Sequence, residues 1–308
     1  MANAPFVTDP IRTAIAIQYT QEAFVADDIL PRRPVGAEEF KWTEYNKADR
    51  FTVPETLVDR KGELNQVEFG GTEKAGMTND YGLKDVIPQK DIDAGARANF
   101  DVLGNATEGL TDLVLLDREM RVSTIMNSTA NYAAGHSETL SAGDRWTATT
   151  GNPIVQLSDA MEVPFMRPNV LLLNPAGALA LRRNAEVVKA YNGTLGDSGL
   201  VPMEWIRQAM ELDQIIVGRA KYNTSKKGQP IVIDRLWQNN AIMIYRNPNA
   251  MPNRGLTYGL TAQYGTRMAM TKFDDEVGLR GATVMKVGES LDELVLANDC
   301  GYLIEGVA

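Results

Sequence analysis

Two residues of this sequence are of the types that could carry acid–base or nucleophilic chemistry. His136 is the only histidine, and Ser198 lies in the tetrapeptide Gly196-Asp197-Ser198-Gly199, which occurs around nucleophilic serines. Catalysis by a serine needs a histidine that is oriented by a carboxylate, and only His136 could serve. Pro202 follows closely and suits the start of a helix. We therefore interpret 196–199 as a loop before a helix, with a serine hydrolase as a minor alternative.

Metal and cofactor signatures are absent from the sequence. Structural zinc needs clusters of Cys and His, and the single cysteine, Cys300, stands 164 residues after His136. No phosphate-binding loop GxxxxGK[ST] occurs, and no GxGxxG follows a strand. Adjacent carboxylates at 27–28 and 274–275 are of a kind that can bind Ca²⁺, but neither pair has the spacing of an EF-hand. We predict no catalytic residue, no cofactor and no metal.

Composition places the chain among globular proteins of a reducing compartment. Of its 308 residues, 44% are apolar and 23% are charged, which is ordinary for a soluble fold. One cysteine cannot form an internal disulfide, as expected in a bacterial cytoplasm. No stretch approaches the roughly 18 apolar residues of a membrane span, and the first residues do not look like a signal peptide.

The charge balance limits nucleic-acid binding. The net charge is −9, and the basic residues form only short pairs at 32–33, 182–183 and 226–227. Tight, sequence-specific binding of nucleic acid needs a basic patch, so we interpret these pairs as solvated surface charge. A negatively charged shell around DNA is compatible with this net charge, because a shell can enclose DNA without binding it tightly.

The first part of the chain predicts two extended segments that lack a core of their own. Residues 1–36 predict an arm with a short helical piece at 11–24, because prolines 31 and 34 block a regular helix. Residues 37–88 predict a long hairpin with a charged tip, on which Phe40, Trp42, Phe51 and Phe69 follow the alternation of strands. A lone hairpin is marginally stable in water. We therefore expect a neighbouring chain to stabilise it.

The clearest helix is predicted over 105–135. Leu115, Val122 and Met126 mark one apolar stripe that continues to positions 129 and 133, and charged residues at 117–119 and 121 lie between the stripes. A helix of this length spans on the order of 40 Å. Gly135 suits its end.

The remainder predicts an α+β fold of mixed order. Strands are predicted at 169–174, 215–217, 231–233, 241–245, 256–270, 283–287 and 294–296, and helices at 175–182, 185–191 and from 202. The residues after 273 form a charged loop that contains Asp274, Asp275 and Arg280 and ends at Gly281.

The order of these parts resembles the major capsid protein of tailed bacteriophages, which has the Hong Kong 97-type fold, and is most similar to Mu-like and related siphophage coat proteins. The resemblance covers most of the chain and depends on the number and order of stretches rather than on a catalytic signature. The stretches are FVADDILPRRPVGAEEFKWTEYNKADRF, VEFGGTEKAGMTNDYGLKDVIPQKDID, LTDLVLLDREMRVSTIMNSTANYAAG, RPNVLLLNPAGALALRRNAEVVKAYNG and VGESLDELVLANDCGYLIEGV.

This resemblance implies a four-part subunit that does no catalysis. Its parts are an N-terminal arm (1–36), an extended hairpin loop (37–88), a peripheral domain (89–152 and 256–296, with the spine helix 105–135) and an axial domain (153–255 and 297–308). The implied function is self-assembly as pentamers and hexamers into an icosahedral virion shell around phage double-stranded DNA. An encapsulin nanocompartment, which shares the fold, is the alternative.

The resemblance also implies partners and contact residues. We expect a separate scaffolding protein, a portal and a decoration protein, no sequence-specific contact with the DNA, and assembly in the host bacterial cytoplasm. Contacts of the hairpin loop are expected at Phe40, Trp42, Phe51, Arg60, Lys61, Glu63 and Phe69. Contacts between capsomers are expected at Asp274, Asp275 and Arg280.

Overall fold

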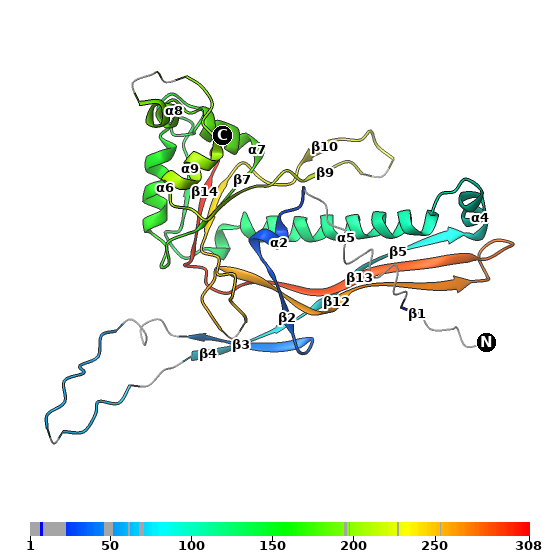
Figure 1. Cartoon of the computed structure of the whole chain (residues 1–308), viewed down its shortest axis with the longest axis horizontal. Helices are drawn as coiled ribbons and strands as arrows, with labels where there is room; N and C mark the ends of the chain where they lie inside the picture. The colour runs from blue at the N-terminus through cyan, green and yellow to red at the C-terminus, as the bar shows by residue number, and fades with distance from the viewer. Residues whose placement is uncertain are drawn as a thin grey trace.

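The computed structural model describes residues 7–8, 23–45, 52–60, 62–67, 71–193, 196, 198–226, 228–252 and 254–308. Two sheets lie at different places along one long helix, α5, and two hairpins project from this body (Figure 1). The α+β fold class expected from the sequence is confirmed. No helix of the described residues is both long enough and apolar enough to cross a membrane.

The first sheet is built on two long antiparallel strands, β12 (Gly259–Asp274) and β13 (Ala282–Val295). On the other side of β13 lies β5 (Asn79–Pro88), while β1 (Val7–Thr8) and the parallel β2 (Arg32–Val35) pair with β12. The prediction of separate strands at 283–287 and 294–296 was wrong, because β13 runs through both. Gly288 pairs with Gly82, where a Cβ would come within 2.9 Å of the Tyr81 carbonyl oxygen.

Helix α5 (Val102–Met126) lies across this sheet and reaches the second one (Figure 1). Its first turn is capped by Asp101, whose carboxylate accepts the Gly104 N–H at 2.9 Å. The predicted end at 135 was wrong. Polar side chains that follow the helix take up its last carbonyl groups instead: the amides of Asn127 and Asn131 and the hydroxyl of Tyr132 donate to Ser123, Ile125 and Met126. Such side chains compete with helix propagation, and a short 3₁₀ turn, η1 (Thr129–Asn131), follows.

The second sheet has the order β6 (Ser137–Thr139), β14 (Gly301–Glu305), β11 (Ala241–Ile244), β7 (Val170–Leu173) and β8 (Gln214–Val217). Helices α6 (Pro153–Glu162), α7 (Pro175–Arg183), α8 (Ala185–Asn192) and α9 (Met203–Ala209) accompany it. Both faces of β7 are buried. Leu171 and Leu173 belong to the cluster with these helices, and Val170 and Leu172 to the cluster with Val122 of α5. This explains the uninterrupted apolar run of β7.

Short elements complete the chain. The projecting hairpin consists of β3 (Glu39–Tyr45) and β4 (Gly71–Met77), as predicted, and a smaller ribbon of β9 (Lys221–Asn223) and β10 (Ile233–Arg235) replaces the strand predicted at 231–233. Helix α2 (Ala26–Ile29) precedes β2, and α4 (Gln89–Arg97) precedes α5. The helical piece predicted at 11–24 lies outside the described residues, except for its last two positions.

Candidate assembly surfaces and the buried junction behind them

The β3–β4 hairpin carries its aromatic residues on one face. The rings of Phe40 and Trp42 are stacked with centroids 5.9 Å apart and lie over Gly76 of β4, where a Cβ would come within 2.7 Å of Phe40 and 2.9 Å of Trp42. Both rings remain half-buried. Lys41 and Glu73 form an exposed ion pair of 3.2 Å, which contributes little to stability. The hairpin thus presents a formed aromatic surface.

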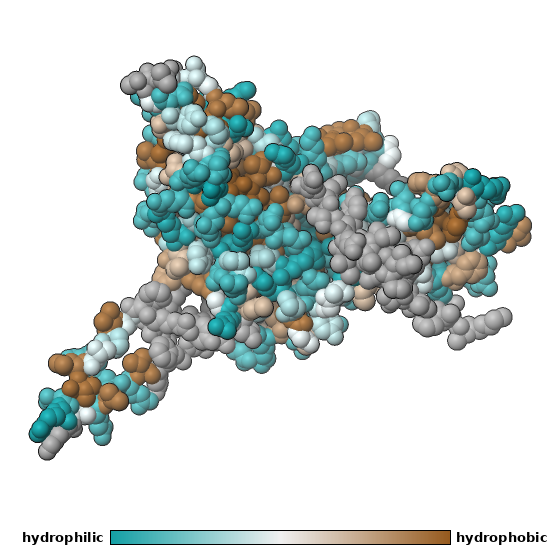
Figure 2. All heavy atoms as spheres, viewed as in Figure 1, coloured by the Kyte–Doolittle hydropathy of each residue, from teal (hydrophilic) through white to brown (hydrophobic). Residues whose placement is uncertain are grey.

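The loop beyond this hairpin extends away from the body with apolar side chains in the open (Figure 2). Val53, Leu57 and Leu64 are 91%, 82% and 84% exposed. The predicted tip residues Arg60 and Glu63 are exposed as well, whereas the predicted contacts Phe51, Lys61 and Phe69 lie outside the described residues. These three apolar residues are not among the contacts predicted from the sequence. The signal that could have found them is their recurrence inside an otherwise polar segment.

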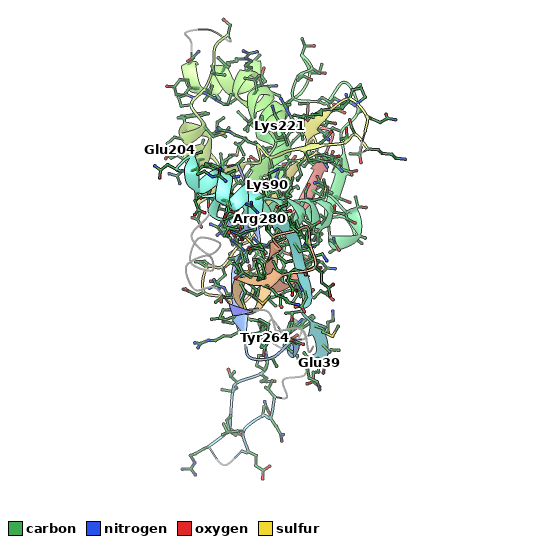
Figure 3. The ribbon with its side chains drawn as sticks, turned by 90° about the vertical axis from the view of Figure 1, so that its right-hand side faces the viewer. Glu39, Lys90, Glu204, Lys221, Tyr264 and Arg280 are labelled. Carbon is green, nitrogen blue, oxygen red and sulfur yellow. The ribbon has the colours of Figure 1, made fainter. Side chains whose placement is uncertain are left out.

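The turn between β12 and β13 forms the far end of the first sheet. Asp274 is the last residue of β12, and its carboxylate accepts the Glu276 N–H at 3.1 Å. Asp275 is exposed, and Arg280 lies 3.6 Å from Asp93 of α4 in a largely exposed pair (Figure 3). The three predicted inter-capsomer residues are therefore together at one tip. Leu279, which sequence reasoning missed, is 101% exposed there.

Glu119 of α5 is the centre of a buried junction behind these surfaces. In the sequence it lies among charges between the apolar stripes, but in the structure it is fully buried. Its carboxylate accepts the N–H groups of Val25 at 3.1 Å and Ala26 at 2.8 Å, and the indole N–H of Trp237 at 2.7 Å. One side chain thereby ties the start of α2 and the segment after β10 to the long helix.

Arg118, the preceding residue, joins the same helix to the first sheet. It is 1% exposed, and it donates to Asp27 at 2.7 Å, to the Leu30 carbonyl oxygen at 3.2 Å and to the Thr261 hydroxyl at 3.2 Å. Thr261 lies on β12. Arg118 and Glu119 thus hold the segment before β2 from two sides.

Glu289 on β13 completes the network. Its carboxylate accepts from Arg32 of β2 at 2.6 Å and from Arg267 of β12 at 3.0 Å. Nearby, Glu293 accepts from Arg121 of α5 at 2.8 Å, and the Arg121 guanidinium lies 3.5 Å above the centre of the Tyr81 ring. These ion pairs connect β2 and α5, which are far away in the sequence, to the neighbouring strands β12 and β13.

The environment shifts the pKa values of these groups in opposite directions. Burial raises the pKa of Glu119 above its ordinary value of 4.5, although the N–H groups of Val25, Trp237 and Ala26 oppose the change. Burial alone would also raise the pKa of Glu289, but the hydrogen bond and charge of Arg32, with the charge of Arg267, lower it overall. Burial and then the neighbouring Arg32 lower the pKa of Arg118.

These shifts predict how Glu289 contributes to acid stability. Because its pKa is lower in the folded than in the unfolded chain, it stabilises the fold above its ordinary value of 4.5, and this contribution disappears as the pH falls through the folded pKa. Glu289→Gln is expected to lower the free energy of unfolding by about 2 kcal/mol at pH 7, and by much less at pH 3. Urea denaturation of the unassembled subunit at both pH values measures this.

The difference between variant and wild type is the quantity to compare. Burial and the neighbouring Glu293 raise the pKa of Asp292 to about 6. This raised pKa changes stability with pH in the opposite direction to Glu289. Because it does so equally in the variant and the wild type, it cancels in the difference between them. Glu276→Gln on the exposed tip serves as the control. An equal loss of stability at pH 7 and pH 3 in Glu289→Gln would show that the ion pairs of Glu289 do not drive the effect.

The residues considered for hydrolysis do not form a triad. His136 Nδ1 lies 3.0 Å from the Gly301 carbonyl oxygen, and its ring lies 6.4 Å from that of Tyr302. A backbone carbonyl thus stands where a triad has a carboxylate. Across the described ranges, no cluster of three His, Cys, Asp or Glu residues could hold a metal ion.

Phage capsid proteins are among the known proteins of similar sequence and structure. No family model matches the chain. The major capsid protein of Pseudomonas phage JBD67 is 46% identical over 305 residues, which cover 99% of this chain and 98% of that protein.

Two solved structures support the fold. A phage-related protein from Bordetella bronchiseptica RB50 superposes with a TM-score of 0.74 at 21% identity over 99% of both chains. The capsid structure of cyanophage P-SCSP1u superposes with a TM-score of 0.60 at 13% identity, covering 94% of this chain and 89% of that one. The chain therefore belongs to the phage major capsid proteins, which are structural proteins of the virion with a Hong Kong 97-like fold and not enzymes.

Proposed function

We propose that copies of this chain assemble as pentamers and hexamers into the icosahedral shell of a tailed phage, around its double-stranded DNA. The observation that carries the proposal is the loop described at 52–60 and 62–67, which extends from the body with Val53, Leu57 and Leu64 more than four-fifths exposed. A monomer gains nothing by exposing such side chains. A neighbouring subunit that covers them supplies the missing partner, and closed symmetry repeats the contact around the shell.

The two sheets support the proposed division of the subunit. The first sheet and α5 form the body proposed as the peripheral domain (89–152 and 256–296), and the second sheet with α6–α9 the axial domain (153–255 and 297–308). Pairing favours placing β5 with the first body, although it lies in the range of the hairpin loop (37–88). It also favours placing β6 with the second body, although β6 lies in the range of the peripheral domain (89–152). The β3–β4 hairpin and its loop then reach a neighbour, whereas the described arm elements α2 and β2 are held to α5 and β12 of the same chain.

The contacts between subunits follow from these surfaces. The hairpin loop contacts a neighbour through Phe40 and Trp42, while the tip at Asp274, Asp275 and Arg280 meets another capsomer. A separate scaffolding protein guides assembly, and a portal and a decoration protein complete the shell. Exposed ion pairs contribute only about 0–1 kcal/mol each, so the apolar contacts carry most of the stability of the shell.

Microscopy of the purified protein tests the proposal. Size-exclusion chromatography with negative-stain electron microscopy, with and without a candidate scaffolding protein, should show closed shells or rings of five and six subunits. A uniform monomer under every condition would contradict the proposal.

The aromatic face of the hairpin gives a sharper prediction. Trp42→Ala is expected to raise the protein concentration needed for assembly by about tenfold or more, because a buried aromatic at the centre of an interface contributes at least about 2 kcal/mol. Light scattering over a concentration series measures this.

Two further variants control for the hairpin itself. Trp42→Phe should keep most of the assembly, because an aromatic ring still covers Gly76. Lys41→Ala, on the opposite face of the same strand, should assemble as wild type. Normal assembly of Trp42→Ala would refute the role of this face.

A further inference from the structure

The ribbon formed by β9, β10 and their connection has a charge unlike that of the rest of the chain. Residues 219–235 contain five basic residues and one acidic residue, a net charge of +4 in a chain whose total is −9. The described basic residues Arg219, Lys221, Lys226 and Arg235 are all exposed. None of the four forms an ion pair with a described acidic side chain. Their charge is therefore directed to the outside of the subunit.

The ribbon overhangs α5 on the side away from the first sheet (Figure 1) and closes one wall of a groove of about 680 Å³. Most of the polar side chains that line the groove carry hydroxyl or amide groups. They are Ser123, Thr124, Asn127, Ser128, Asn174, Tyr222, Gln238 and Asn239, with one ion of each sign at Arg235 and Asp234. Arginine and lysine together with such uncharged donors are the groups that proteins use to contact phosphate and sugar.

We propose that this ribbon and groove bind the sugar–phosphate backbone of double-stranded DNA without reading its sequence. The inference rests on the proposed function, since it assumes that the shell encloses DNA, and it adds the surface that the DNA touches. It also orients the subunit: the face of α5 that carries the ribbon points to the interior, and the first sheet points outward.

The same ribbon offers a competing surface that the experiment must separate. Ile231, Val232 and Ile233 are 75%, 57% and 62% exposed and would suit an acidic protein segment with apolar side chains. These three residues are not part of the groove lining. The net positive charge of residues 219–235, beside a groove lined mainly by hydroxyl and amide groups, favours DNA as the ligand.

Fluorescence anisotropy with a short double-stranded DNA of random sequence tests the proposal on the full-length subunit. Lys221→Gln combined with Lys226→Gln is expected to weaken binding by about tenfold or more at low salt. It should also reduce the slope of log affinity against log salt by about 2, because each neutralised phosphate contributes about 0.9.

A matched control changes the same charge elsewhere. Lys90 on α4 and Lys189 on α8 are both exposed and lie outside the ribbon. Lys90→Gln with Lys189→Gln should leave both affinity and slope unchanged. Ile231→Thr with Ile233→Thr should also bind DNA as wild type.

The outcomes separate this inference from the proposed function. Absence of DNA binding by the wild type at low salt, or an equal loss in both lysine pairs, overturns the inference, while shells seen by microscopy would leave the proposed function intact. Shell assembly that depends on Ile231 and Ile233, with DNA binding independent of Lys221 and Lys226, would assign the ribbon to a protein partner instead. A wild type that binds DNA but never forms shells would contradict the proposed function alone.

Discussion

Glu119→Ala is expected to lower the free energy of unfolding of the subunit by about 4 kcal/mol. The substitution leaves three buried donors, the N–H groups of Val25 and Ala26 and the indole of Trp237, without their acceptor, and each such loss costs roughly 1–3 kcal/mol. Urea denaturation followed by circular dichroism measures the change. Hydrogen exchange should also accelerate at the amides of 25–29, because α2 loses its attachment to α5.

Two variants sharpen this prediction. Glu119→Gln keeps one acceptor oxygen but turns an amide N–H₂ toward other donors, so an intermediate loss of about 2 kcal/mol is expected. Glu108→Ala, on an exposed position of the same helix, should stay within about 0.5 kcal/mol of wild type. If Glu119→Ala matched Glu108→Ala, the carboxylate would not be what holds the N-terminal segment.

Arg118→Ala is expected to lower the free energy of unfolding by about 3–5 kcal/mol, which is typical of breaking a buried ion pair. Its partners, however, have other donors. Arg32 still donates to Asp27, and the Thr261 hydroxyl still donates to the Leu30 carbonyl oxygen at 3.0 Å. Most of the loss should therefore come from the empty volume. Arg118→Met fills that volume, so it should lower the free energy of unfolding by only about 1.5 kcal/mol.

The comparison of the two Arg118 variants decides between volume and charge. Equal losses in Arg118→Ala and Arg118→Met, measured by the same denaturation, would mean that the hydrogen bonds of Arg118 matter more than its packing. Arg254→Ala, at an exposed position, provides the baseline for removing a guanidinium from this chain.

Elements with strong local signals were predictable. Pro175 predicted the start of α7, and the structure adds the cap: the Asn174 side chain accepts the Gly177 N–H at 2.7 Å. The alternation of β3 correctly placed Phe40 and Trp42 on one face. Boundaries that depend on distant partners were not predictable, as in α5, whose stripe continued past Met126 in the sequence but not in the structure.

The sequence by itself determined the α+β class, the projecting hairpin and the resemblance to phage coat proteins, because these depend on local periodicity and on the order of segments. The tertiary structure alone decided the roles of Arg118 and Glu119. Charged residues on a helix are ordinarily solvated, and nothing near them in the sequence indicates otherwise. The partners of Glu119 are 94 residues away at Val25 and 118 residues away at Trp237, and a partner of Arg118 is 143 residues away at Thr261. Only folding brings those partners together, and their hydrogen bonds offset the free-energy cost of burying the charges.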